Sequence, residues 1–198
     1  MPDHALLIVD VQNDFCPGGA LPVQSGDRVV PVLNAYIERF TRLGLPVYAS
    51  RDWHPAETRH FQARGGPWPA HCVQGTAGAE FHPGLKLPRT AHIITKGTSS
   101  EDHGYSAFEG VTEQGGELAA ALKNAGIRTL YVGGLATDYC VHTSVMDARV
   151  ADFAVVLLLD AVRGIDVQEG DVARALDEMV RAGARTATLA TIDTDLSE

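Results

Sequence analysis

Short hydrophobic runs alternate with longer segments of helical spacing along most of this chain. The runs at 5–9, 46–50, 91–95, 130–132, 153–159 and 186–191 are short and rich in apolar or β-branched residues, which is typical of strands buried on both faces. Apolar positions three or four residues apart predict helices at 27–43, 116–124 and 167–181. Another helix is expected to start at Thr137 or Asp138, either of which can cap it, and to end near Val150.

Six strands with connections long enough to hold helices predict an α/β fold. We expect a three-layer α/β/α domain with a six-stranded parallel sheet in the order 3-2-1-4-5-6. The segment 51–88 departs from the pattern because it is irregular and rich in Gly, Pro and His. Such long segments in compact domains are usually functional. No repeat or linker interrupts the pattern, so residues 1–198 are interpreted as one domain.

The composition narrows the class of protein. Of 198 residues, 45% are hydrophobic and 21% are charged, as in ordinary folded proteins. The formal net charge is -9 and no Lys/Arg cluster occurs, which argues against nucleic acid or an anionic membrane as a partner. Cys16, Cys72 and Cys140 form neither a disulfide framework nor a CxxC pair. With no signal peptide or membrane span in the hydrophobic runs, we expect a cytoplasmic protein.

Three reactive side chains follow predicted strands and should meet at one edge of the sheet. Asp10 ends the first strand, Lys96 ends the third, and Cys140 follows the two glycines that end the fourth. In the expected order, Asp10 and Cys140 face each other across the switch point between strands one and four. Near a helix amino terminus, the Cys140 thiol should have a lowered pKa and act as a nucleophile. Asp10 can then serve as general base and general acid, while Lys96 favours both anions.

Each of these three residues also has a purely structural interpretation. Cys140 could be core packing, Asp10 a turn cap and Lys96 a solvated amine, and for each residue alone this is the more frequent case. Their coincidence at the ends of strands in one sheet favours a catalytic site.

A second group contains Asp52, His54, His60 and His71. Asp52 and His54 are two residues apart just past a strand, so in extended chain their side chains point the same way. Imidazoles with a carboxylate suit zinc, iron or manganese without selecting among them. Histidines are common in surface loops, and Asp-x-His alone is a weak signal. Four candidate ligands within twenty residues nevertheless indicate a metal site.

These residues stand in six short motifs: Ile-Val-Asp-Val-Gln-Asn-Asp-Phe around Asp10, Asp-Trp-His at 52–54, Trp-Pro-Ala-His-Cys-Val-Gln-Gly-Thr at 68–76, Lys-Gly at 96–97, Tyr-Ser-Ala-Phe at 105–108 and Gly-Leu-Ala-Thr-Asp-Tyr-Cys at 134–140. Together and in this order, the motifs resemble the nicotinamidase branch of the isochorismatase-like cysteine hydrolases. The resemblance implies a six-stranded parallel α/β sheet. It also implies hydrolysis of nicotinamide to nicotinate and ammonia, as in NAD salvage, often with pyrazinamide as a second substrate.

By this resemblance, Cys140 is the nucleophile that forms a thioester, Asp10 is the base and Lys96 is the third catalytic residue. A cis peptide bond of the family would here join Leu135 to Ala136. The backbone N–H groups of Ala136 and Cys140 would then form the oxyanion hole.

The resemblance also implies one divalent metal ion and an aromatic substrate pocket. Zinc is the first choice for the metal, with iron or manganese as alternatives, and its role would be to orient the pyridine ring. Tyr139 occupies a position where some nicotinamidases carry His. The ion would be held by Asp52, His54, His60 and His71, and the substrate by Phe15, Leu21, Trp68, Tyr105 and Tyr139.

Two other functions stay open at this point. The chain could be a different small-amide hydrolase of the same superfamily, or a non-catalytic module that binds a metal or a ligand. The expected partner is a small molecule, nicotinamide. The sequence does not decide the identity of the metal, the preference among related amides, or whether the protein is a homo-oligomer.

Overall fold

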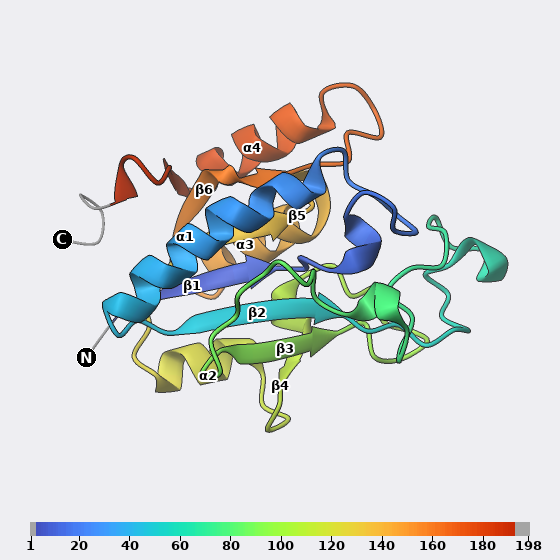
Figure 1. Cartoon of the computed structure of the whole chain (residues 1–198), viewed down its shortest axis with the longest axis horizontal. Coiled ribbons are helices and arrows are strands. Elements are labelled where there is room, and N and C mark those ends of the chain that lie inside the picture. Colours follow the sequence, from blue (N-terminus) through green and yellow to red (C-terminus); the bar gives the residue numbers. More distant parts are fainter. Residues whose placement is uncertain (1–2, 193–198) are drawn as a thin grey trace.

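The computed structural model describes residues 3–192, and a seven-stranded sheet lies at its centre (Figure 1). The order is β4-β3-β2-β1-β5-β6-β7, and every pair is parallel except β3 with β4. The six parallel strands therefore have the predicted order, with the switch point between β1 and β5. The strands are β1 (His4–Val9), β2 (Val47–Asp52), β3 (His92–Lys96), β4 (Val111–Thr112), β5 (Thr129–Leu135), β6 (Ala154–Arg163) and β7 (Arg185–Ala187).

Helices cover both faces of the sheet, which confirms the predicted three layers. Alternate residues of β1 point to opposite faces: Leu6 and Ile8 belong to one hydrophobic cluster, Leu7 and Val9 to the other. The first cluster includes α1, and the second includes α2, α3 and α4. Among residues 3–192, every helix is too short or too polar to cross a membrane. The helices are α1 (Val29–Arg42), α2 (Leu118–Asn124), α3 (His142–Val150) and α4 (Asp171–Arg181).

The sheet differs from the prediction at its two edges. One strand, β4, was not predicted. It has only two residues and pairs antiparallel with β3, so it is too short to produce a hydrophobic pattern. β7 ends at residue 187 instead of 191 because the chain turns there. In that turn the Thr191 N–H donates to Thr188 O (3.0 Å), and the Leu189 N–H donates to Asp160 Oδ2 (2.9 Å).

The helix that carries the predicted nucleophile begins in an unexpected way. A π-helical turn (Thr137–Val141) precedes α3, and neither Thr137 nor Asp138 caps it. The Asp138 carboxylate instead accepts hydrogen bonds from the backbone N–H groups of Ile165 (2.9 Å) and Asp166 (2.7 Å). The cap prediction was wrong because this side chain connects the turn to the loop after β6.

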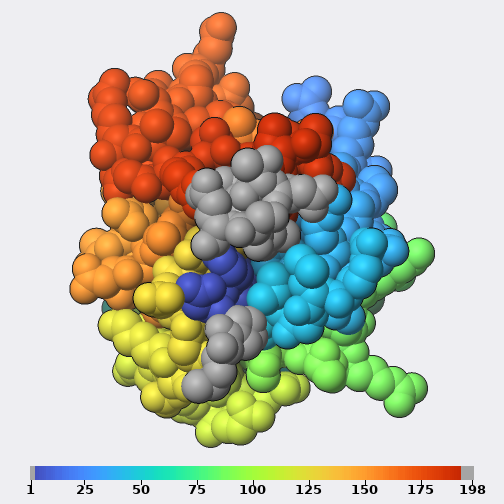
Figure 2. Space-filling view, turned by 90° about the vertical axis from the view of Figure 1, so that its left-hand side faces the viewer, coloured from blue at the N-terminus to red at the C-terminus, as the bar shows by residue number. Residues whose placement is uncertain are grey.

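The two ends of the parallel strands differ. Figure 2 views their amino ends, where the start of β1 (blue) is enclosed by chain preceding β2 (cyan) and β5 (yellow). The carboxyl ends carry the long 53–91 connection between β2 and β3 and the turn between β5 and α3. Since ligands of open parallel sheets bind at the carboxyl ends, a functional site is expected there.

β1 and β5 pack tightly against each other at Gly134. Its φ is +126°, and a Cβ atom at this position would overlap the backbone of Val9. Only glycine satisfies both conditions. The contact lies directly before Asp10 on one strand and Leu135 on the other, so it determines the spacing of the strand ends at the switch point.

Gly134→Ala should therefore destabilise the fold by more than about 4 kcal/mol, because backbone atoms cannot move aside. Gly126→Ala is the matched control: its φ is +77°, but no atom lies within 4 Å of the added Cβ. The control should lose only about 1 to 2 kcal/mol. Urea unfolding of both variants measures the difference, and equal losses would contradict the role of close packing.

Candidate active site

The three predicted catalytic side chains meet beyond the carboxyl ends of β1, β3 and β5. Lys96 Nζ lies 2.7 Å from Asp10 Oδ2 and 3.6 Å from Cys140 Sγ. All three side chains are buried. The structure thus brings together a thiol, a carboxylate and an ammonium group from separate segments, while their catalytic roles remain predictions.

Asp10 is held by the neighbouring strand. Its φ of +48° is uncommon for a residue other than glycine. Its N–H donates to Ser50 O (3.2 Å), and its Oδ1 accepts a hydrogen bond from Ser50 Oγ (2.7 Å). One carboxylate oxygen is therefore anchored, and the other is left for Lys96.

Burial affects the pKa of all three side chains. It raises the pKa of Asp10 to about 6, although the Lys96 charge opposes the rise. Burial disfavours the charged form of Lys96, but Asp10 and Asp52 raise the pKa of its ammonium group well above the usual value. Burial likewise raises the pKa of Cys140 well above its usual range, and both carboxylates add to this while Lys96 opposes it. The expected lowering by a helix terminus was wrong, so the thiol must lose its proton as it reacts.

The four predicted metal ligands also converge. His54, His60 and His71 each offer a ring nitrogen, and these atoms lie within 4.8 Å of one another. Asp52 Oδ2 lies 3.6 Å from His54 Nε2 and 4.0 Å from His71 Nε2. All four side chains are buried, so their polar atoms do not form hydrogen bonds to bulk water.

This set fits a divalent cation. Both ring nitrogens of His54 and Nδ1 of His60 are buried without a hydrogen-bond partner, which is unfavourable unless they bind something. Burial lowers the pKa of His60 to about 3 and also lowers the pKa of His71, so both rings are neutral and have a free lone pair. His71 Nδ1 lies 2.8 Å from Pro69 O, and donation there leaves Nε2 as a ligand atom.

Contacts within the 53–91 connection position these histidines. The His54 N–H donates to Cys72 O (2.9 Å), and the Gln74 N–H donates to His54 O (2.9 Å). The buried Phe61 ring packs against all three imidazoles, with ring centroids 5.4 to 6.4 Å away. Gly97 lets the chain after β3 pass close to His54, since a Cβ there would lie 2.5 Å from ring atom Cε1.

Asp52 belongs to both groups. Its Oδ1 accepts a hydrogen bond from Lys96, while Oδ2 faces the histidines. The buried Gln12 amide holds its backbone: the Asp52 N–H donates to Gln12 Oε1 (2.8 Å), and Gln12 Nε2 donates to Asp52 O (2.8 Å). Burial opposes ionisation of Asp52, but Lys96 and His54 keep the pKa of its carboxyl below the ordinary value. This ionised group joins the two clusters.

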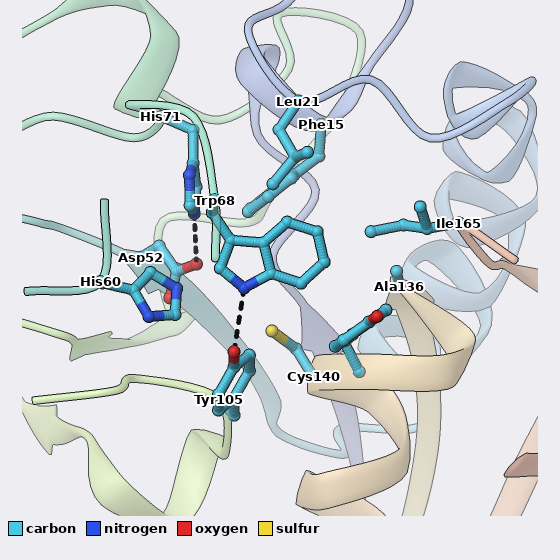
Figure 3. Close-up of a pocket in the computed structure, with 11 residues that line it drawn as sticks. Phe15, Leu21, Asp52, His60, Trp68, His71, Tyr105, Ala136, Cys140 and Ile165 are labelled. Carbon is cyan, nitrogen blue, oxygen red and sulfur yellow. Dashed lines mark hydrogen bonds and ion pairs between the residues drawn. The ribbon is translucent and has the colours of Figure 1, made fainter. Parts of the chain in front are cut away.

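A small pocket opens at this junction, beside the Cys140 sulfur. Figure 3 shows histidines on one side of it and the Cys140 sulfur on the other. Trp68 Nε1 donates to Tyr105 Oη (2.9 Å), and the Trp68 ring packs edge-on against Tyr139 with centroids 4.8 Å apart. Such walls suit a flat ring. The lining residues are Phe15, Leu21, Asp52, His60, Trp68, His71, Tyr105, Ala136, Tyr139, Cys140 and Ile165.

All five predicted substrate-binding residues therefore line the pocket, and so does Ala136 of the predicted oxyanion hole. The Leu135–Ala136 peptide bond is cis, as the family resemblance implied. Ala136 O accepts hydrogen bonds from the N–H groups of Tyr139 and Val141, both at 3.1 Å. The carbonyl is thus used within the turn, and the role of the backbone N–H groups as an oxyanion hole remains a prediction.

Besides Gln12, three supporting groups were not found from the sequence. Ser50 ends the segment paired with β1 and holds Asp10. Ile165 follows β6 and lines the pocket. The strand-end rule that found Asp10 could have found both of these residues. The carbonyl of Gly104, which accepts a hydrogen bond from Lys96, lies in a loop without any sequence pattern.

Several known proteins are similar to this chain in sequence or in fold. The nicotinamidase of Escherichia coli (strain K12) is 41% identical over 206 residues, covering 96% of this chain and 97% of that relative. The structure of pyrazinamidase of Pyrococcus horikoshii in complex with zinc has a TM-score of 0.88 and 46% identity, covering 95% of this chain and 100% of that one. PnC1 from L. infantum in complex with nicotinate has a TM-score of 0.82 and 36% identity, covering 94% and 93%.

The family model described as the isochorismatase domain matches residues 4–191, which is nearly the whole chain. Its span includes the strand ends, the irregular 53–91 connection and the turn before α3. The chain therefore belongs to the isochorismatase domain family.

Proposed function

We propose that this protein is an amidohydrolase that converts nicotinamide to nicotinate and ammonia, and that also accepts pyrazinamide. One observation carries the proposal: the Cys140 sulfur, flanked by Lys96 and Asp10, faces an aromatic pocket whose other side holds three histidines and a carboxylate. A relative named nicotinamidase and a similar structure that contains nicotinate support this substrate class.

In the first half-reaction, Asp10 takes the thiol proton as Cys140 Sγ attacks the carboxamide carbon. The buried thiol is protonated at rest, so proton transfer and attack go together. The backbone N–H groups of Ala136 and Cys140 stabilise the negative charge on the carbonyl oxygen. Asp10 then gives the proton to the amide nitrogen, the C–N bond breaks, and ammonia leaves behind a thioester.

In the second half-reaction, Asp10 takes a proton from a water molecule whose oxygen attacks the thioester carbon. The C–S bond breaks and the proton returns to sulfur. The product leaves as nicotinic acid, which gives its remaining carboxyl proton to solvent and becomes nicotinate. Lys96 keeps its charge throughout because its ammonium pKa is raised by the carboxylates around it. It holds Asp10 in place and stabilises negative charge on the sulfur.

We assign Asp52, His54, His60 and His71 as ligands of the divalent metal, and zinc as the ion. Three imidazoles with one carboxylate suit zinc, and the similar pyrazinamidase structure contains zinc. When bound, the ion supplies a Lewis acid for the pyridine nitrogen, which selects and orients the ring. Trp68 and Tyr105, joined by their hydrogen bond, and Phe15 enclose the ring from the sides.

The wild-type protein should release ammonia from nicotinamide and pyrazinamide faster than from a linear carbamoyl amide. Cys140→Ala should lower kcat by about 10⁴-fold or more, because no other group can form the acyl intermediate. Nicotinamide should still bind this variant, as calorimetry can show. Cys16→Ala is the control, since Cys16 is buried outside the pocket. Substantial turnover by Cys140→Ala would refute the covalent route, and a preference for the carbamoyl amide would favour another hydrolase.

His54→Ala should remove the metal and mainly raise KM. Loss of a group that only hydrogen-bonds to a metal ligand costs about 10- to 100-fold in metal affinity, so loss of a ligand itself should exceed about 100-fold. Metal content by mass spectrometry and KM for nicotinamide test this. His92→Ala is the control, because His92 is exposed and packs on Tyr48 away from the pocket. Unchanged metal content in His54→Ala would remove that residue from the ligand set.

The pH dependence should follow Asp10. Its carboxyl must be ionised to act as base, and its pKa is about 6 because of burial. We expect kcat/KM to be level above about pH 7 and to fall about tenfold per pH unit below about pH 6. Ser50→Ala removes a hydrogen bond that favours the ionised form, so its acidic limb should shift to higher pH. Superimposable profiles of the two proteins would argue against Asp10 as the base.

A further inference from the structure

We propose that Asp14 is a positioning residue that couples metal binding at His71 to the order of the substrate pocket. This rests on the proposed function, since it concerns the same metal and pocket. Asp14 directly precedes the pocket residue Phe15 in the chain, and it belongs neither to the residues that line the pocket nor to the grouped ligand atoms.

The Asp14 carboxylate holds two segments that are distant in sequence. Its Oδ2 accepts a hydrogen bond from the Cys72 N–H (2.7 Å), directly after the ligand His71. Its Oδ1 accepts one from the Ala20 N–H (3.1 Å), directly before the pocket residue Leu21. The backbone carbonyl of Asp14 also accepts a hydrogen bond from the Leu21 N–H (3.0 Å). One side chain thus fixes both the metal-binding segment and the pocket wall.

Two glycines allow this arrangement. A Cβ at Gly78 would overlap the Asp14 carboxylate, and a Cβ at Gly19 would overlap the backbone of Asn13 and Asp14. Backbone therefore packs directly around the carboxylate, which leaves it little freedom to exchange partners. The Phe15 ring, on the next residue, lies 5.4 Å from the His71 ring between centroids. The pocket wall and the metal ligand are consequently in contact as well as joined through Asp14.

A consequence is reciprocal coupling. If metal binding fixes His71, it also fixes the hydrogen bonds that Asp14 accepts from the N–H groups of Cys72 and Ala20. The neighbouring pocket residues Phe15 and Leu21 are then fixed with them. A ligand that packs on this wall must then favour metal binding by the same factor. The effect is separate from any bond between the metal and a substrate nitrogen. Benzamide distinguishes the two, because it has the ring and the amide but no ring nitrogen.

The first test is zinc affinity, measured by competition with a chromophoric chelator. Asp14→Ala should weaken zinc binding about 10-fold or more, the range for groups that orient a ligand. Asn34→Ala is the matched control: it also removes two backbone hydrogen bonds, to Gly84 O and from the Lys86 N–H, both 2.8 Å, far from the metal ligands in sequence. A loss of general stability would affect both variants, and equal zinc affinity in both would overturn the proposal.

The second test is benzamide binding by calorimetry, with and without zinc. Zinc should raise the affinity of the wild type about 5-fold or more, and this gain should be lost in Asp14→Ala. Asp14→Asn, which retains one acceptor oxygen, keeps the test readable if the alanine variant unfolds, and it should lie between the two. No zinc effect on the wild type, or an undiminished effect in both Asp14 variants, would refute the coupling. Neither measurement involves turnover, so failure of nicotinamide hydrolysis would be recognised separately.

Discussion

The site depends on one interaction, the pairing of the buried Lys96 ammonium group with the carboxylates of Asp10 and Asp52. A charged group removed from water costs several kcal/mol unless partners replace its hydration. Here the partners are the Asp10 and Asp52 carboxylates and the Gly104 carbonyl, with the Cys140 sulfur nearby. They come from separate segments, and Asp52 faces Lys96 directly in the β2–β3 register. A shift of strand order or register would leave a buried charge unpaired, so the electrostatics of the site and the topology of the sheet require each other.

Asp52 divides its two oxygens between two tasks. One neutralises the ammonium group beside the sulfur, and the other faces the imidazoles. Because the two oxygens of a carboxylate are a fixed distance apart, the Lys96 ammonium group beside the Cys140 sulfur and the imidazoles both face one rigid group. The Gln12 amide, bonded to the Asp52 backbone on both its N–H and C=O, supports this geometry from behind.

Most of the fold was predictable because buried parallel strands produce continuous apolar runs, and strand ends then locate Asp10, Lys96 and Cys140. The irregular 53–91 connection has no periodicity. Its histidines were predicted as metal ligands from their residue type and clustering, whereas Trp68 was predicted as a pocket residue by resemblance to a family. The features that were missed depend on contacts between distant segments. The Asp138 carboxylate accepts a hydrogen bond from the Ile165 N–H instead of capping the helix. Burial raises the pKa of the Cys140 thiol, and burial of this residue is not visible in the local sequence pattern.

The edge strands have a consequence for the behaviour of the protein in concentrated solution. β4 offers two residues and runs against its neighbour, and β7 offers three. An open sheet invites cross-molecular pairing in proportion to the length of regular unpaired backbone that it presents. Because β4 and β7 are so short, a second molecule has little regular backbone to pair with at either edge of the sheet. Growth of the sheet into fibrils is therefore disfavoured, although the interior strands are strongly apolar.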